Sequence, residues 1–507
     1  MTPPGRPRGL SPPLVAFLVA GAVSFAGSFS WALGGGDETW FLAVMSRLLS
    51  GDRLYRDLFF GSLPLSAQLA EPVFRIFGCE ILVLRALIVL SFAGSAGFLV
   101  KAAGDLGIQR RQLPVFVLAL LVFADGGPAH LYSPLSAFFL SATLAAVVAF
   151  RRRPRPGLLA AAGLLAGLTF AAKPNVGGAA LAAAALSLAA VPPCPAASLR
   201  GAALFGAAAA LPVVLPLLPF LTPGGGMGDL LEYVALNKGT YLRVAGVPYT
   251  ESVVRAVRLF LAPPRSGSEF LDVVLAFRSF VLPAALLAFL VAWARRGGAE
   301  RRSGAVLALF SLAALSAIFP RADVSHLAYA LPVPLLAAVW ALPATKRSPV
   351  TRRAVIAVGG LLAVIVSAAL LRGPVGLLRG TWTFLGLPHV RGVLFPASGA
   401  PEVRRQAAEL RRAAAGQPLF LLSSDAAFWS LVSGVRNPTP FDCPRSTAFG
   451  RTGEARLLLD IESGRLSRVC MAPSPDWRLR PLLLEDAVPL LMRPAGPAGP
   501  CTLFVRP

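Results

Sequence analysis

Most of the chain alternates long apolar runs with short polar segments, from Leu10 to about residue 372. A hydrocarbon core about 30 Å thick is crossed by roughly 20 apolar residues in a helix. The pattern predicts an all-α polytopic membrane protein with about eleven transmembrane helices. We place them at about residues 10–33, 81–100, 113–123, 134–150, 157–172, 176–191, 202–221, 273–293, 304–319, 327–342 and 354–371.

Clusters of arginine and lysine between these runs predict which side of the membrane each loop occupies. They lie at residues 6–8, 101–111, 151–155, 200, 295–302 and 346–353, and all fall on one side when the spans are threaded in order. Basic residues in short loops mark the cytoplasmic side. We therefore predict a multi-pass protein of the cell inner (plasma) membrane, with outer loops at residues 34–80 and 222–270.

The pattern of hydrophobic and polar residues changes after the last apolar run. Residues 401–417 have helical spacing with a charged face, and PLFLLSS follows as a short buried-strand pattern. ARLLLDIESGRL and CTLFVRP supply further helix or strand candidates. We predict a transmembrane domain at residues 1–372 and a small extracytoplasmic α/β domain at 373–507, with the active site on the same outer side.

Composition excludes several classes of protein. The chain is 55% hydrophobic and only 14% charged, and its mean hydropathy is +0.67, which excludes an ordinary soluble globular protein. The net charge of +23 lies largely in the loop clusters, where it sets topology and meets anionic lipid, so we predict no nucleic-acid partner. The first apolar run has no clear cleavage site and is expected to be a span.

The five cysteines show no spacing typical of a zinc site. We predict no metal and no cofactor. Cys443, Cys470 and Cys501 all fall in the C-terminal segment, where one disulfide can form if that segment is extracytoplasmic.

The most suggestive chemistry is the pair of neighbouring carboxylates Asp37 and Glu38, which follow three glycines at the outer end of the first run. Either they are solvated residues that end a span, or one of them is a general base at the membrane surface. Side chains of adjacent residues diverge on a regular backbone, so at most one is expected to face a reacting group. From the residues alone, the first interpretation is slightly favoured.

Other outer polar residues are candidate substrate ligands. Asp57 has Arg53 and Arg56 beside it, so a surface ion pair is the plain alternative. Lys173 closes a Gly/Ala-rich hairpin and either extends to the lipid headgroups or binds phosphate. His130, next to Tyr132, is a weaker candidate.

The late segment Phe319–His326 adds three more candidates. Arg321 can grip a phosphate with its planar guanidinium, Asp323 can hold Arg321 or a sugar hydroxyl, and His326 can donate to a phosphate oxygen. An internal Arg–Asp pair in a polar turn is the alternative. Together the outer loops place carboxylates and cations on one membrane face, which suits transfer of a group from a lipid phosphate.

Several motifs in order resemble the membrane-embedded C-type glycosyltransferases, which include protein O-mannosyltransferases and lipid A aminoarabinose transferases. They are DETWF, then GDRLYRDLFFGSLPLSAQLAEPVFRIFG followed after six residues by RAL, then GLLAGLTFAAKPNVG, and finally FPRADVSHLAYALPVP. The resemblance covers roughly residues 10 to 345. It implies a GT-C fold and transfer of a sugar from a polyprenyl-phosphate donor with inversion at the anomeric carbon.

The resemblance also implies roles for particular residues. Asp37 would be the base on the acceptor and Glu38 its neighbour, while Lys173, Arg321 and His326 would hold the donor phosphate. The expected partners are the lipid-linked donor, membrane lipid, and an envelope glycan, lipid or protein as acceptor. The Leu63-Pro64-Leu65 segment is thinner than the proline-rich pattern of many relatives, which leaves the acceptor open.

A lipid or polysaccharide transporter, or a scaffold of envelope assembly without catalysis, is the alternative function. A transporter is expected to carry ionisable residues deep within its spans. Here they gather at the outer ends, which favours an interfacial active site.

Overall fold

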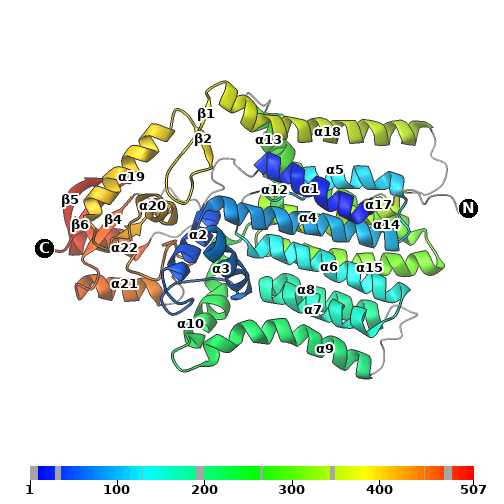
Figure 1. Cartoon of the computed structure of the whole chain (residues 1–507), viewed down its shortest axis with the longest axis horizontal. Helices are drawn as coiled ribbons and strands as arrows, with labels where there is room; N and C mark the ends of the chain where they lie inside the picture. The colour runs from blue at the N-terminus through cyan, green and yellow to red at the C-terminus, as the bar shows by residue number, and fades with distance from the viewer. Residues whose placement is uncertain are drawn as a thin grey trace, which may run out of the picture.

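The computed structural model describes residues 10–28, 36–127, 130–189, 199–262, 267–342, 349–449, 452–472 and 482–507. The basic cluster at residues 6–8, part of the cluster at 346–353, Gly34, Gly35 and Cys194 lie outside these ranges. Figure 1 shows a bundle of long helices lying side by side, with a smaller α/β region at one end of it.

A helix occupies each apolar segment predicted to span the membrane. These are α1 (Pro12–Ser28), α4 (Ile81–Asp105), α5 (Leu113–Phe123), α6 (Tyr132–Arg152), α7 (Pro156–Ala172), α8 (Pro174–Ala189), α9 (Leu199–Val214) with η2 (Leu215–Leu221), α14 (Arg278–Ala294), α15 (Gly298–Leu315) with η4 (Ser316–Ile318), α16 (Val324–Ala330) with α17 (Pro332–Ala341), and α18 (Pro349–Leu378).

Six of the described helices are each long and apolar enough to cross a membrane. The number rises to seven if the pair α16 and α17, bent by 52°, counts as one span. Shorter apolar helices at Pro12–Gly27, Pro156–Ala172 and Pro174–Ala189 accompany them. The membrane-protein class is therefore clear, whereas the count of about eleven spans stays a prediction. The predicted domain boundary at residue 372 falls inside α18, which continues to Leu378.

Glycine allows α7, α8 and α9 to pack backbone against backbone. A Cβ on Gly167 would lie 2.1 Å from the carbonyl oxygen of Ala209 on α9, and one on Gly177 would lie 1.9 Å from the Cα of Phe170. Small residues permit such close approach between membrane helices. The tight α7–α8 hairpin fixes the turn that carries Lys173 at the end of α7.

The outer loops form short helices between the bundle and the C-terminal region, as Figure 1 shows for α2, α3 and α10. The first loop holds α2 (Gly36–Leu49) and α3 (Leu65–Phe77). The second loop and its continuation hold α10 (Met227–Leu231), the π-helical η3 (Glu232–Leu236), α11 (Lys238–Ala245), α12 (Tyr249–Leu261) and α13 (Gly267–Ala276), and η1 (Arg110–Gln112) lies between α4 and α5.

The C-terminal region combines two small sheets with four helices in its described residues. Strands β1 (Trp382–Phe384) and β2 (Leu394–Pro396) form an antiparallel pair. A four-stranded sheet has the order β3-β4-β6-β5, in which only β3 and β4 are parallel. Its strands are β3 (Phe420–Leu422), β4 (Arg468–Met471), β5 (Arg493–Ala498) and β6 (Cys501–Val505), accompanied by α19 (Ala400–Ala414), α20 (Ala426–Ser433), α21 (Gly453–Glu462) and α22 (Leu483–Leu491).

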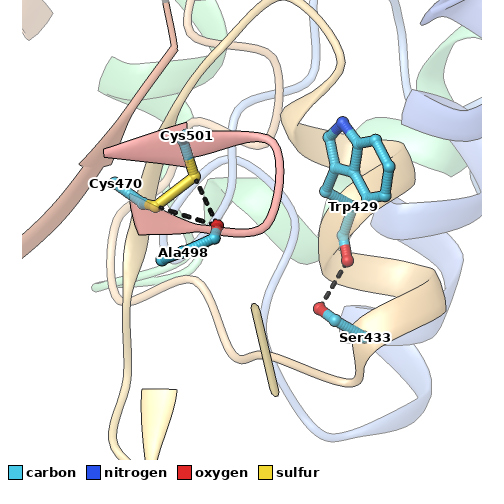
Figure 2. The surroundings of a disulfide bond; sticks show 5 residues. All are labelled: Trp429, Ser433, Cys470, Ala498 and Cys501. Atoms are coloured by element: carbon cyan, nitrogen blue, oxygen red, sulfur yellow. Dashed lines mark hydrogen bonds between the residues drawn. A yellow bond between two sulfur atoms is a disulfide. The ribbon is translucent and has the colours of Figure 1, made fainter. Parts of the chain in front are cut away.

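A disulfide joins this sheet. Cys470 on β4 bonds to Cys501 on β6, and both sulfurs lie near the carbonyl oxygen of Ala498 (Figure 2). Cys443 takes no part in this disulfide. Of the three cysteines considered for a disulfide, the first one in the chain is thus left out.

One apolar core joins the first outer loop to the C-terminal region. Trp40, Phe41 and Met45 of α2 belong to the same buried cluster as Phe420 of β3 and Leu431 of α20. The bundle has a core of its own, formed chiefly by α4, α6, α15 and α17. The C-terminal region is therefore packed onto α2 rather than joined to the bundle only through α18.

Candidate active site

Asp37 lies in the first turn of α2, and Figure 1 shows α2 at the end of the bundle that faces the C-terminal region. Its side chain is 57% exposed, and its Oδ2 lies 3.7 Å from Nε2 of His130, which is buried. His130 belongs to the turn just before α6. The two predicted candidates, about 90 residues apart in sequence, therefore meet at one place.

The neighbouring Glu38 has the opposite environment. Its side chain is fully buried, and its two oxygens accept hydrogen bonds from Nε and Nη2 of Arg85 on α4, at 2.6 Å and 2.9 Å. A carboxylate that is held by a guanidinium in two places and shielded from water is poorly placed to accept a proton from an acceptor. The two carboxylates thus diverge, as adjacent residues were expected to do.

His130 is held in its neutral form. Burial lowers its pKa to about 4, although the charge of Asp37 acts in the opposite direction. Among the described residues its Nδ1 has no hydrogen-bond partner. We therefore assign the ring proton to Nε2, where it faces Asp37. The ring lies against Tyr132, with 3.6 Å between the ring centres.

Lys173 forms the C-terminal cap of α7. Only 9% of the residue is exposed, and its Nζ lies 3.4 Å from Oγ of Ser133. The ammonium also lies 6.0 Å from the centre of the Tyr132 ring. Since Tyr132 also contacts His130, the lysine and the histidine lie on the same aromatic side chain.

Asp323 links the two other cationic candidates. Its Oδ2 accepts a hydrogen bond of 3.0 Å from Nε of Arg321, and its Oδ1 lies 2.8 Å from Nδ1 of His326. Its Oδ1 also accepts the backbone N–H of His326 and so caps α16. Burial raises the pKa of Asp323, but hydrogen bonds and charge from His326 and Arg321 outweigh it and hold that pKa well below its ordinary range. The internal pair of Arg321 with Asp323, which was the alternative interpretation of this segment, is therefore formed.

Two neighbouring segments hold the backbone around Arg321. Val247 forms a bridge with it, and the N–H of Ala322 donates to the Val247 carbonyl at 2.9 Å. Asn175, two residues after Lys173, donates to the carbonyls of Ser316 and Phe319 at 2.7 and 3.2 Å. The α7–α8 turn and the segment before α16 thus support each other.

Charge interactions join these groups into one cluster. His130 interacts with Asp37, His326 and Lys173, and Arg321 interacts with Asp37 and Asp323. Six of the eight candidate residues therefore lie together, with Glu38 directly behind Asp37. Asp57 lies apart in the first outer loop, where it pairs with Arg53 and Arg56 at 3.7 and 3.8 Å.

Two tyrosines of the cluster were not among the candidate residues. Tyr241 on α11 hydrogen-bonds with Arg321 and interacts with the charge of Asp37. Tyr329 interacts with Asp37 and Asp323. Tyr329 lies three residues after His326 on the same helix face, which was a usable signal. Nothing in the sequence marks Tyr241. In the part of the chain that the structure describes, no three His, Cys, Asp or Glu side chains form a group that could hold a metal.

No family model matches the chain, and no curated protein matches it. Among solved structures, ArnT from Cupriavidus metallidurans bound to undecaprenyl phosphate matches 97% of this chain and 97% of its own, with a TM-score of 0.53 and 15% identity. ArnT in the apo state matches over the same shares, with a TM-score of 0.55 and 14% identity. The chain has the fold of ArnT.

The arabinofuranosyltransferase AftD from Mycobacteria gives a TM-score of 0.52 at 16% identity, over 98% of this chain and 40% of AftD. These similarities confirm the predicted GT-C type of fold. With the apolar helices, they make the chain a multi-pass membrane protein.

Proposed function

We propose that the chain is an integral membrane glycosyltransferase that moves a sugar from a polyprenyl-phosphate donor to an acceptor outside the cytoplasm. One observation carries the proposal: on an ArnT-like fold, the exposed carboxylate of Asp37 lies in a cluster with the cations Lys173 and Arg321. A base beside phosphate-binding cations is the pairing that such a transfer needs.

In this mechanism Asp37 accepts the proton of an acceptor hydroxyl, and the hydroxyl oxygen attacks the anomeric carbon. The bond from that carbon to the phosphate oxygen breaks, and its electron pair leaves with the polyprenyl phosphate. Lys173 and Arg321 stabilise the departing charge. Because the attack comes from the side opposite the leaving group, the product is inverted.

The remaining cluster residues orient these groups. A neutral His130, whose Nε2 lies 3.7 Å from Oδ2 of Asp37, faces the carboxylate without neutralising its charge. Asp323 holds Arg321 and His326, so the latter is available to a phosphate oxygen only through its other ring nitrogen. Glu38 is assigned to positioning rather than to proton transfer.

The donor class is supported by ArnT, whose structure was solved with undecaprenyl phosphate bound. The acceptor (an envelope glycan, lipid or protein) and the identity of the sugar, hexose or pentose, are not assigned. We place the cluster and the C-terminal region on the outer face of the inner membrane because the basic loops mark the opposite side.

The decisive experiment is Asp37→Asn in the full-length protein in membranes, assayed for transfer from a polyprenyl-phosphate sugar. We expect transfer to fall at least about 100-fold, as is typical when a general base is lost, while affinity for polyprenyl phosphate is retained. Asp105→Asn is the matched control, because Asp105 pairs with Lys101 and Arg152 at the far ends of α4 and α6. Undiminished transfer by Asp37→Asn would reject the assignment.

The transporter alternative makes a different prediction in the same assay. A transporter moves intact lipid-linked sugar across the membrane without releasing polyprenyl phosphate. Release of polyprenyl phosphate that depends on both acceptor and Asp37 therefore distinguishes an enzyme from a transporter or a scaffold.

A further inference from the structure

Helix α2 carries Asp37 at its first turn and Arg47 at its last turn. Both ends contact a single stretch of the C-terminal region, residues 437–449, which we call the 437–449 segment. The middle of α2 packs on the same region, since Trp40 and Phe41 share a buried cluster with Phe441 and Phe449. The position of α2 therefore depends on a part of the chain about 400 residues away.

Arg47 is the anchor at the far end of α2. Its Nη1 donates to the carbonyl of Thr439 at 2.7 Å and lies 3.1 Å from Oδ1 of Asp442. Its other nitrogens bind Asp52 at 2.7 Å and the carbonyl of Asp57 at 2.9 Å. One guanidinium thus ties α2 to the turn that follows it and to the 437–449 segment.

Asp442 is the partner of this anchor and is itself held in place. Its side chain is 2% exposed, and its Oδ1 also accepts a hydrogen bond of 2.9 Å from Nδ2 of Asn437. Burial raises the pKa of Asp442, against the effect of Arg47. Burial lowers the pKa of Arg47, but Asp442 and Asp52 outweigh it. Removing one partner would therefore leave the other as a buried charge without its counter-ion, which is costly.

The segment also touches the first turn of α2 and the second outer loop. The guanidinium of Arg445 lies over Gly36, where a Cβ would be 2.9 Å from its Nη2. The carbonyl of Thr447 accepts a hydrogen bond of 2.6 Å from Asn237, at the start of α11. Since α11 carries Tyr241, the segment bridges two loops that both contribute to the cluster.

We propose that the 437–449 segment positions α2, and through it Asp37, with the Arg47–Asp442 ion pair as its anchor. The C-terminal region is then part of the catalytic unit rather than a separate module attached by α18. Asp442 and Arg47 act as positioning residues, because neither touches the cluster itself. This inference rests on the proposed function, since it gives the role of the C-terminal region in placing the base.

The test is Asp442→Asn in the full-length protein, with transfer and polyprenyl-phosphate affinity measured on the same preparation. Lys173 and Arg321, which would bind the phosphate, lie on the bundle and its turns, so affinity is expected to stay within about twofold. Turnover is expected to fall at least about tenfold, because small misplacements of a base are costly.

Asp460→Asn is the matched control, because Asp460 on α21 pairs with Arg465 at 2.7 Å on the surface of the same region. If Asp442→Asn cannot be purified, Asn437→Ala removes the side-chain hydrogen bonds to Asp442, to the Phe441 carbonyl and to Thr439, and leaves both partners of the ion pair in place. We expect it to lower turnover about threefold with unchanged affinity.

Normal turnover in these variants, or an equal loss of turnover and affinity, would overturn the inference. Asp37→Asn is measured beside them to separate the two proposals. If Asp37→Asn is inactive while Asp442→Asn is fully active, only the positioning role fails. If Asp37→Asn transfers normally, the proposed function fails first.

Discussion

Glu38 and Arg85 form a buried bidentate ion pair. Nε and Nη2 of Arg85 lie 2.6 and 2.9 Å from the two carboxylate oxygens of Glu38. The pair joins α2 to α4, and the exposed fractions of the two side chains are 0% and 2%. Because Glu38 directly follows Asp37, the pair fixes the rotation of the first turn of α2. Asp37 is thereby turned toward His130.

Breaking this pair on one side is expected to destabilise the fold. Glu38→Gln or Arg85→Met leaves a buried charge without its main partner, which costs about 3 to 5 kcal/mol. The double variant Glu38→Leu/Arg85→Met removes both charges and is expected to be considerably more stable than either single variant. The order of stability of these variants is measured by thermal melting in detergent. The native protein that remains after heating is quantified by size-exclusion chromatography.

The same double variant separates two roles for Glu38. If Glu38 only positions Asp37, the folded double variant retains measurable sugar transfer. A folded double variant with no transfer at all would instead place Glu38 in the chemistry. Arg75→Met is the control, since Arg75 pairs with Glu71 on the exposed face of α3.

The buried His130 predicts a pH dependence of stability. Its folded pKa of about 4 lies below the ordinary value of 6.5, so between these values the unfolded chain binds more protons. Stability from this residue is therefore present above about pH 6.5 and is lost as the pH falls toward 4. The loss is about 2 kcal/mol by pH 5.

His130→Asn is expected to remove this contribution. The melting temperature of the wild type is expected to fall more between pH 7 and pH 5 than that of the variant, with both measured in the same detergent. Equal pH dependence of the two proteins would contradict a neutral, buried His130 beside Asp37.

Asn175 predicts a defect in donor binding without direct contact with the donor. Asn175→Ala removes the hydrogen bonds to the carbonyls of Ser316 and Phe319, which costs about 1 to 2 kcal/mol in total. Lys173 lies two residues before Asn175, and Arg321 lies two residues after Phe319. We expect the KM for a polyprenyl-phosphate sugar to rise severalfold with little change in kcat.

Thr222→Ala provides the comparison for Asn175→Ala. In the part of the chain that the structure describes, the Thr222 hydroxyl donates within its own turn, to the carbonyl of Pro219 at 2.9 Å. A KM change of the same size in both variants would show that general loosening of the outer loops, rather than the link between the two cationic segments, is responsible.

Much of the helical architecture could be predicted because period and length are local properties of the sequence. The predicted spans near residues 81–100 and 134–150 correspond to α4 and α6. The count could not be settled in the same way, since α5 has 11 residues and α8 has 16. Such helices are too short to cross alone and depend on their neighbours.

The C-terminal sheet was predicted only in part. PLFLLSS contains β3, which is buried throughout, and CTLFVRP contains β6. β5 was missed because its sequence, RPAGPA, carries two prolines. Proline is tolerated in an edge strand, and β5 is an edge strand in the order β3-β4-β6-β5.

The candidate site was predictable as a membrane face but not as a set of contacts. Threading the spans placed Asp37, Lys173 and Arg321 on one side, and they lie in one cluster. The partner of Glu38 was not identified, although an arginine inside an apolar run was itself a signal. Pairings between residues far apart in sequence, such as Arg47 with Asp442, depend on tertiary packing that no local pattern encodes.

The disulfide between Cys470 and Cys501 predicts the compartment of the C-terminal region. Disulfides persist in oxidising compartments and are rare in the cytosol. If the region is extracytoplasmic, these two cysteines are oxidised in protein isolated from cells, whereas Cys443 lies outside the disulfide. Denaturation followed by maleimide labelling is expected to modify two more thiols after reduction than before it.

Cys470→Ser/Cys501→Ser is expected to abolish that difference and to lower stability by about 2 to 4 kcal/mol, while Cys443→Ser leaves the difference unchanged. Full labelling of the wild type without reduction would place the region in a reducing compartment and reverse the proposed orientation of Asp37 and its cluster.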